Sequence, residues 1–134
     1  DDWIARRRTN ARRITQAAQL HACVRVPEPP AHVDHAAYKH YMFVRPEALR
    51  DGWSRDRIIQ EITVRGVPCY QGSCSEIYLE KAFEGTGYRP SERLPNARQL
   101  GETSLMFLVH PSLTPAELDK TCAVVSDVLT QALR

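Results

Sequence analysis

Apolar residues recur at helical spacing in three long segments of the chain. The first twenty residues, the stretch 54–65 and the stretch from Pro115 onward each bury one stripe at a period near 3.6 and are predicted helices. Ser54 and Gly66 bound the second helix, at the positions of an N-cap and of a left-handed C-terminal residue. The expected stripe of the first helix is Trp3, Ile4, Ala11, Ile14, Ala18 and Leu20, and that of the last is Leu118, Cys122, Val125, Val128, Leu129 and Leu133.

Two capping boxes mark the starts of helices. Thr114 with Glu117 opens the last helix, with Pro115 at its first position. Ser73 with Glu76 opens a second predicted helix, a short one that carries Ile77, Tyr78, Leu79, Ala82 and Phe83. Another short helix is expected from about Pro95 to Leu100, ended by Gly101.

Short runs of β-forming residues alternate with these helices. Strands are predicted over 23–26, 37–44, 67–70 and 104–109, and a Pro-rich loop follows the first of them. Helices interleaved with a few strands indicate an α+β fold, a small and largely antiparallel sheet with helices packed on one side.

Composition narrows the class of protein. The 134 residues, 43% hydrophobic and 25% charged, suit one globular domain, 1–134. A net charge of +2 argues against a nucleic-acid partner, although Arg6, Arg7 and Arg12 give the first helix a basic face. No apolar run is long enough to span a membrane. Four irregularly spaced cysteines favour reduced thiols and a cytoplasmic location, and the missing initiator Met suggests that the chain is cut at its N-terminus.

The residues alone do not complete a catalytic set. His32, Asp34 and His35 cluster without the spacing of a metal site, and no metal is expected. Cys74, placed at a predicted helix start, with His110 as base is the candidate for thiol catalysis. An inert thiol near a cap is the simpler interpretation.

Two other features of the sequence, the turn 71–75 and Lys39, each allow a functional and a purely structural interpretation. The turn 71–75 leads small residues toward a helix and could receive an anion, or merely cap the helix. Lys39 lies in an aromatic strand, where a Schiff-base role is imaginable and a surface lysine is the simpler interpretation.

A family resemblance rests on the order of several motifs. The segment 66–78 resembles the G-I-x-x-x-x-H-Y-x-P-x-H-x-x-x-Y strand of the DegT/StrS family, with Tyr70 and Tyr78 on its two tyrosines. His110 to Thr114 resembles the later H-P-x-L-T piece. The segment 2–8 resembles the L-D-x-x-I-x-x-R-R start of the family's small domain, and 38–44 resembles its aromatic strand.

The sequence also departs from the family pattern. Both histidines of the H-Y-x-P-x-H piece are cysteine here, Cys69 and Cys74, and its proline is Gly72. Tyr41 stands where the aromatic strand often has His, and Leu108 where a proline is expected. These changes imply a variant substrate pocket.

The resemblance implies the C-terminal small domain of a fold-type I, pyridoxal-phosphate-dependent aminotransferase. Such an enzyme aminates a nucleotide-linked keto sugar from glutamate in polysaccharide or lipopolysaccharide biosynthesis, and the family forms homodimers. The implied substrate-binding residues are Tyr41, Tyr70, Ser73, Cys74, Ser75, Tyr78 and His110. A core role for Tyr70 and Tyr78 is the alternative.

The resemblance also limits what this chain is expected to do alone. The family's cofactor lysine and most phosphate ligands lie in the large domain, so this chain alone is predicted to bind no cofactor and to have no transaminase activity. Its expected partners are the sugar nucleotide, glutamate and its own large domain. The rival hypothesis is a stand-alone, non-catalytic α+β module that binds a ligand or a protein.

Overall fold

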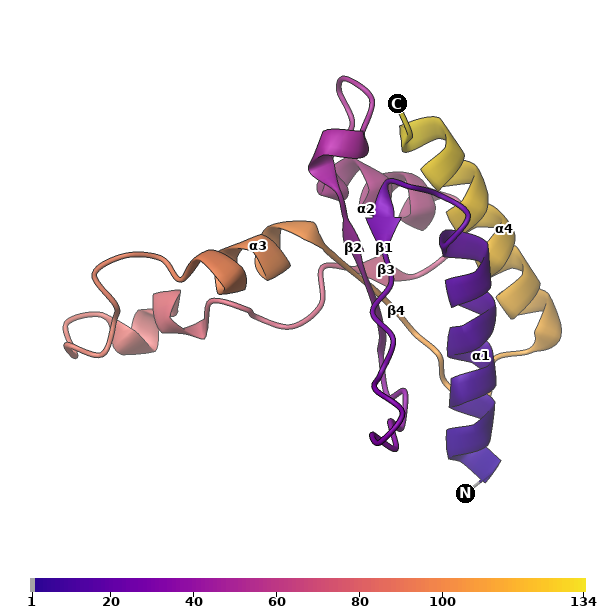
Figure 1. Ribbon diagram of the computed structural model, residues 1–134, viewed down its shortest axis with the longest axis horizontal. Helices are drawn as coiled ribbons and strands as arrows, with labels where there is room; N and C mark the ends of the chain where they lie inside the picture. Colours follow the sequence, from indigo (N-terminus) through magenta and orange to yellow (C-terminus); the bar gives the residue numbers. More distant parts are fainter. Residues whose placement is uncertain (1) are drawn as a thin grey trace.

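The computed structural model describes residues 2–134 as four α-helices and a four-stranded sheet, which confirms the predicted α+β class (Figure 1). The helices are α1 (Asp2–Ala18), α2 (Arg55–Val64), α3 (Pro95–Thr103) and α4 (Pro115–Ala132), and the strands are β1 (Val24–Arg25), β2 (His40–Val44), β3 (Cys69–Tyr70) and β4 (Ser104–Phe107). Three 3₁₀ turns complete the order, η1 (Pro46–Ala48), η2 (Ile77–Leu79) and η3 (Lys81–Phe83).

The sheet is antiparallel throughout, in the order β1-β2-β4-β3. Tyr41 lies opposite Met106, and Met106 lies opposite Tyr70, so these three side chains share one face. His40, Phe107 and Cys69 share the other.

The core lies between that second face and the helices α1, α2 and α4 (Figure 1). Met42, Leu105 and Phe107 from the sheet and Ile14 from α1 are fully buried. Of the stripe expected on α1, Ala11, Ile14 and Ala18 are buried, whereas Trp3 and Leu20 are 65% and 79% exposed, so their predicted core role is wrong. The stripe of α4 is confirmed at Leu118, Val125, Val128 and Leu129.

The predicted caps of the long helices are confirmed. The Ser54 side chain accepts from the N–H of Arg57 and caps α2, and Gly66 has a φ of +76°. Thr114 and Glu117 form the reciprocal capping box of α4. The Ser54 and Thr114 side chains satisfy backbone N–H groups that the start of a helix leaves unpaired. These two local signals therefore define where α2 and α4 begin.

Residues 71–103 form an arm that leaves the body between β3 and β4 (Figure 1). Two predictions fail here. The Glu76 side chain binds Arg93 and Tyr78 instead of capping, and 76–83 forms two 3₁₀ turns rather than a helix. Gly101 lies within α3 and does not end it, and a Cβ there would come within 2.3 Å of the Ser75 Oγ.

The strands are shorter than the sequence predicts. Ala37 has a φ of +48°, and the chain bends through 38–39, so β2 begins at His40 rather than at Ala37. Val26 and Val67 lie outside β1 and β3, and β4 ends at Phe107 rather than Val109. Among the described residues, no helix is long and apolar enough to cross a bilayer.

Candidate functional site

The root of the arm brings three of the predicted site residues together. The Tyr41 hydroxyl lies 3.1 Å from the Ser73 Oγ, and Tyr70 lies across Met106 from Tyr41 on the same sheet face. Gly72 makes this approach possible, because a Cβ at that position would lie 2.5 Å from the Tyr41 ring. Tyr70 remains 48% exposed, so its hydroxyl is accessible on the face that α1, α2 and α4 leave open.

Hydrogen bonds from α2 and β4 fix the root of the arm. Arg55, whose side chain is 12% exposed, donates from Nη1 to the carbonyls of Gly101 at 2.9 Å and Ser104 at 3.1 Å. The Ser104 hydroxyl donates to the carbonyl of Gln71. The two limbs of the arm are therefore bound to the sheet by charged and neutral donors.

The outer arm is cross-linked by a network around Glu76. Arg93 donates from Nε to Glu76 at 2.8 Å, and the Tyr78 hydroxyl donates to the same carboxylate at 2.7 Å. Bonding to Arg93, and then to Tyr78, lowers the pKa of Glu76 to about 2. The Tyr78 hydroxyl also accepts from the N–H of Leu94 at 2.9 Å, so both of its hydrogen-bonding roles are used within the arm.

The other predicted site residues lie apart from this group. Ser75 packs under Gly101, and Cys74 is exposed with its Sγ 3.4 Å from the Glu80 carboxylate. His110 lies in the loop between β4 and α4, where its Nδ1 is 2.7 Å from the Ser112 Oγ and its ring centroid is 6.4 Å from that of Trp3.

The structure contradicts the premise of the thiol-nucleophile hypothesis. Desolvation, together with the Glu80 carboxylate, raises the pKa of Cys74, and no helix starts there. The ring of His110, the proposed base, binds Ser112 in the loop between β4 and α4, whereas Cys74 lies in the arm. A thiol held neutral beside a carboxylate is a poor nucleophile.

Two smaller candidates are also accounted for. Asp34 pairs with Arg8, and His35 accepts from the N–H of Ala37, so two of the three loop residues considered for a metal make protein contacts. Over residues 2–134, no group of three His, Cys, Asp or Glu side chains is arranged to hold a metal ion. Arg13 pairs with Asp119, so part of the basic face of α1 is neutralised within the chain.

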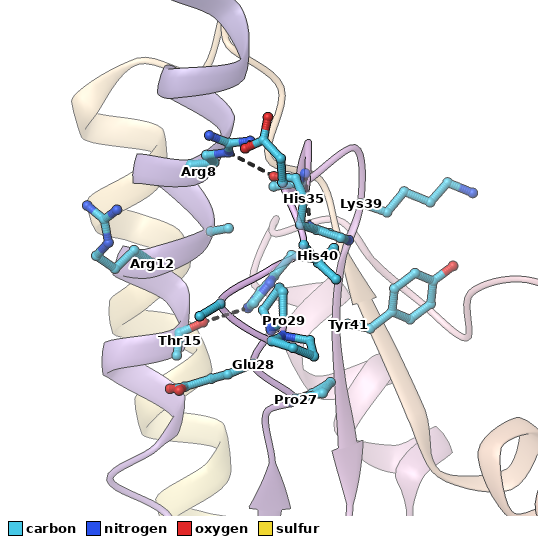
Figure 2. Close-up of a pocket in the computed structure, with 16 residues that line it drawn as sticks. Arg8, Arg12, Thr15, Pro27, Glu28, Pro29, His35, Lys39, His40 and Tyr41 are labelled. Carbon is cyan, nitrogen blue, oxygen red and sulfur yellow. Dashed lines mark hydrogen bonds and ion pairs between the residues drawn. The ribbon is translucent and has the colours of Figure 1, made fainter.

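Sequence reasoning missed a pocket of about 760 Å³ between α1, the loop 26–39 and β2, here called the α1–β2 pocket (Figure 2). His40 points from β2 toward α1, with its Nε2 3.1 Å from the Thr15 Oγ1, whereas Lys39 and Tyr41 point away from α1. Burial, and secondarily the neighbouring His35, lowers the pKa of His40 to about 4. The ring is therefore neutral at pH 7. The Pro cluster 27–30 was the available sequence signal for this feature.

Comparisons with known proteins find aminotransferases that share this fold. An aminotransferase from Psychrobacter cryohalolentis is 48% identical with a TM-score of 0.93, over 98% of this chain and 35% of that one. The sugar aminotransferase CalS13 from Micromonospora echinospora shares the fold at 15% identity and a TM-score of 0.77, over 95% of this chain and 31% of that one. NtdA from Bacillus subtilis, solved with bound cofactor PMP, shares the fold at 20% identity and a TM-score of 0.78, over 96% of this chain and 29% of that one.

The family model of the DegT/DnrJ/EryC1/StrS aminotransferases matches residues 1–126, and the chain belongs to that family. A comparison with curated protein sequences gave no match. The chain spans about a third of the length of each of these three solved proteins.

The residues present do not fit pyridoxal phosphate as a covalently held group. The three lysines are Lys39, Lys81 and Lys120. Lys81 and Lys120 are exposed, Lys39 is half-buried, and its side chain points away from α1 (Figure 2). A cofactor lysine needs a desolvated or otherwise activated setting, which none of the three has.

Proposed function

We propose that the chain is the C-terminal small domain of a pyridoxal-phosphate-dependent aminotransferase that aminates a nucleotide-linked keto sugar. The observation that carries this proposal is the 48% identity to an aminotransferase over 98% of this chain. The cofactor and its lysine would belong to the rest of that enzyme, because the lysines here do not suit it. The cofactor supplies the electron-sink chemistry, and protein groups position the substrate.

The open face of the sheet and the root of the arm are the surfaces proposed to bind the substrate. Tyr41, Tyr70 and Ser73 place three hydroxyls there, and a hydroxyl can both donate to and accept from sugar hydroxyls. Cys74, Ser75 and His110 remain predicted contacts. Tyr78 is better explained as a structural residue of the arm, since its hydroxyl is already fully bonded.

The remaining features of the proposal come from the family resemblance. They are glutamate as amino donor, a role in surface-polysaccharide biosynthesis, a homodimer and a cytoplasmic location. The presence of a sugar aminotransferase among the proteins that share the fold supports the sugar substrate.

Conservative tyrosine variants in the native enzyme test the site. Tyr70→Phe removes one exposed hydroxyl, and we expect KM for the sugar nucleotide to rise about fivefold, the cost of one hydrogen bond, with KM for the amino donor unchanged. Tyr88→Phe is the matched control, because Tyr88 is 79% exposed at the outer end of the arm. Equal KM values for wild type, Tyr70→Phe and Tyr41→Phe would contradict this location of the site.

A further inference from the structure

A largely buried guanidinium, that of Arg55, joins the first turn of α2 to the end of α3. The Arg55 side chain is 12% exposed, and its Nη1 donates to the carbonyls of Gly101 at 2.9 Å and of Ser104 at 3.1 Å. The carbonyls at the end of a helix have no partner within that helix, and a cationic donor suits them. Arg55 therefore holds the place where the arm returns to the sheet.

The limb of the arm that leaves the sheet is bound to the limb that returns. The Ser104 hydroxyl donates to the carbonyl of Gln71. The Gln71 side-chain amide donates to Asp56 at 3.4 Å, and Asp56 pairs with the Nε of Arg55 at 2.7 Å. These bonds close a circuit, here called the root cluster, of Arg55, Asp56, Gln71 and Ser104. A shift of the Arg55 guanidinium is therefore transmitted to both limbs.

The root cluster lies two residues before a side chain of the proposed substrate site. Gly72 follows Gln71, and its missing Cβ lets the chain pass against the Tyr41 ring. The next residue, Ser73, places its Oγ 3.1 Å from the Tyr41 hydroxyl. The hydrogen bonds of the Arg55 side chain go to two backbone carbonyls and to Asp56, so its influence on Ser73 is indirect.

We propose that Arg55 is a positioning residue of the substrate site, which sets the place of Ser73 beside Tyr41 by fixing Ser104 and, through it, Gln71. The inference rests on the proposed function, which assigns the Tyr41 and Ser73 hydroxyls to the sugar. A small misplacement of a binding group lowers a rate markedly, even when its cause lies far from the reacting atoms. Arg55 therefore acts on the reaction of the sugar substrate and leaves that of the amino donor unaffected.

The variant Arg55→Met in the native enzyme tests this selectivity, since it keeps the apolar stem and removes the guanidinium. A transaminase takes its two substrates in separate half-reactions, so kcat/KM for each substrate reports on its own half-reaction. We expect kcat/KM for the sugar nucleotide to fall about tenfold, as for the loss of a charged hydrogen bond, and kcat/KM for the amino donor to stay within about twofold. A general loss of folded enzyme lowers both values equally. An equal fall in both, or no change in either, would overturn the proposal.

Arg57→Met is the matched control on the same helix. The Arg57 guanidinium also donates to a carbonyl, that of Gly52 at 3.0 Å, and lies over the Trp53 ring at 4.5 Å from its centroid. Both partners precede α2 and lie outside the arm, so both kcat/KM values should stay within about twofold of wild type. A selective fall for the sugar nucleotide in Arg57→Met would show that the effect does not pass through the arm and would contradict the proposal.

Ser104→Ala tests the same path with a smaller change, which keeps the guanidinium in place. It removes the hydroxyl that binds the Gln71 carbonyl, so kcat/KM for the sugar nucleotide should fall about threefold while that for the amino donor stays unchanged. This variant decides the question even where Arg55→Met fails to fold. A Ser104→Ala enzyme without the selective fall would contradict the path through Gln71.

The NMR signals of the Tyr41 ring test the positioning independently of activity. They should shift in Arg55→Met, because the Gly72 backbone lies against that ring, and stay unchanged in Arg57→Met. Unchanged Tyr41 signals in Arg55→Met would overturn the inference and leave the proposed function standing. A native protein that shows the shift but transaminates no nucleotide sugar would overturn the proposed function, and with it the assignment of Ser73 to a sugar, but not the link from Arg55 to the root of the arm.

Discussion

At the scale of single residues, charged side chains determine the form of the arm. Glu76 satisfies Arg93 and Tyr78 instead of capping a helix, and Arg89 donates to the carbonyls of Tyr78, Leu79 and Glu80. These side-chain contacts add to the 3₁₀ hydrogen bonds of the segment, in which the N–H of Leu79 donates to the carbonyl of Glu76 and the N–H of Phe83 to that of Glu80. Side-chain donors therefore hold a segment that has little regular secondary structure.

The ionisation of Glu76 makes the arm sensitive to acid. Its pKa in the folded protein, about 2, lies below its ordinary value, so its contribution to stability is complete above about pH 4.5 and is lost as the pH falls toward 2. We expect protease cleavage within 84–92 to be constant from pH 7 to 5 and to increase below pH 4.5, followed with an acid-active protease.

A single substitution tests the contribution of the Glu76 carboxylate separately from that of the other acidic residues. Glu76→Gln should raise protease cleavage of the arm at neutral pH above that of the wild type, because the neutral amide binds Arg93 less strongly. Glu92→Gln, in the same exposed segment, is the control and should behave as wild type. Equal resistance of Glu76→Gln and wild type at pH 7 would argue against the network.

The environment of Cys74 predicts a slow thiol. Desolvation and the Glu80 carboxylate raise its pKa, so the thiolate fraction at pH 7 is below that of a free cysteine. Alkylation of Cys74, followed by mass spectrometry, should be slower than that of a model thiol, and Glu80→Gln should accelerate it. Cys23 and Cys69 are buried and should stay unmodified in the folded protein. Cys74 alkylated faster than the model thiol would restore the nucleophile hypothesis.

At the scale of elements, the arm depends on a close approach at its root. Gly72 has a φ of +99°, and the Tyr41 ring occupies the space where a side chain would start. This close contact between one glycine and one aromatic ring therefore acts together with the hydrogen bonds of Arg55 and Ser104 at the root of the arm.

Two alanine variants distinguish backbone strain from this contact. Gly85→Ala also lies at a positive φ, +70° against +99° for Gly72, with nothing within 4 Å of the new Cβ, so it should cost about 1 kcal/mol from backbone conformation alone. Gly72→Ala adds a collision with the Tyr41 ring, so its free energy of unfolding, measured by chemical denaturation, should fall by more than that of Gly85→Ala. The NMR signals of Tyr41 should also shift in Gly72→Ala. Equal losses in the two variants would show that the contact is unimportant.

At the scale of the whole molecule, local signals predicted the body well and the arm poorly. Ser54, Gly66 and the Thr114–Glu117 box act through neighbours in sequence, so they could be recognised without the fold. The sequence predicts a helix stop at Gly101, because the close packing of this glycine against Ser75, 26 residues earlier, cannot be seen in the sequence. The partners of Glu76 also depend on how the two limbs meet.

The candidate site also divides into residues that the sequence identifies and positions that only the fold determines. Tyr41, Tyr70 and Ser73 were identified from a family resemblance, and the sheet register brings them together across Met106. His110 was grouped with them by motif alone and lies elsewhere. The α1–β2 pocket was missed because it forms only where α1, the loop 26–39 and β2 meet, which a proline cluster alone does not reveal.

The central claim is that this chain is one domain of a working aminotransferase, and the native protein tests it most directly. One run would record its intact mass, the absorbance of any bound pyridoxal phosphate and the response to borohydride. We expect a mass about three times that of the 134-residue chain, since the chain spans 35% of the aminotransferase from Psychrobacter cryohalolentis, and a cofactor band that borohydride abolishes. A native mass equal to that of these 134 residues, with no cofactor band, would contradict the claim and favour a stand-alone binding module.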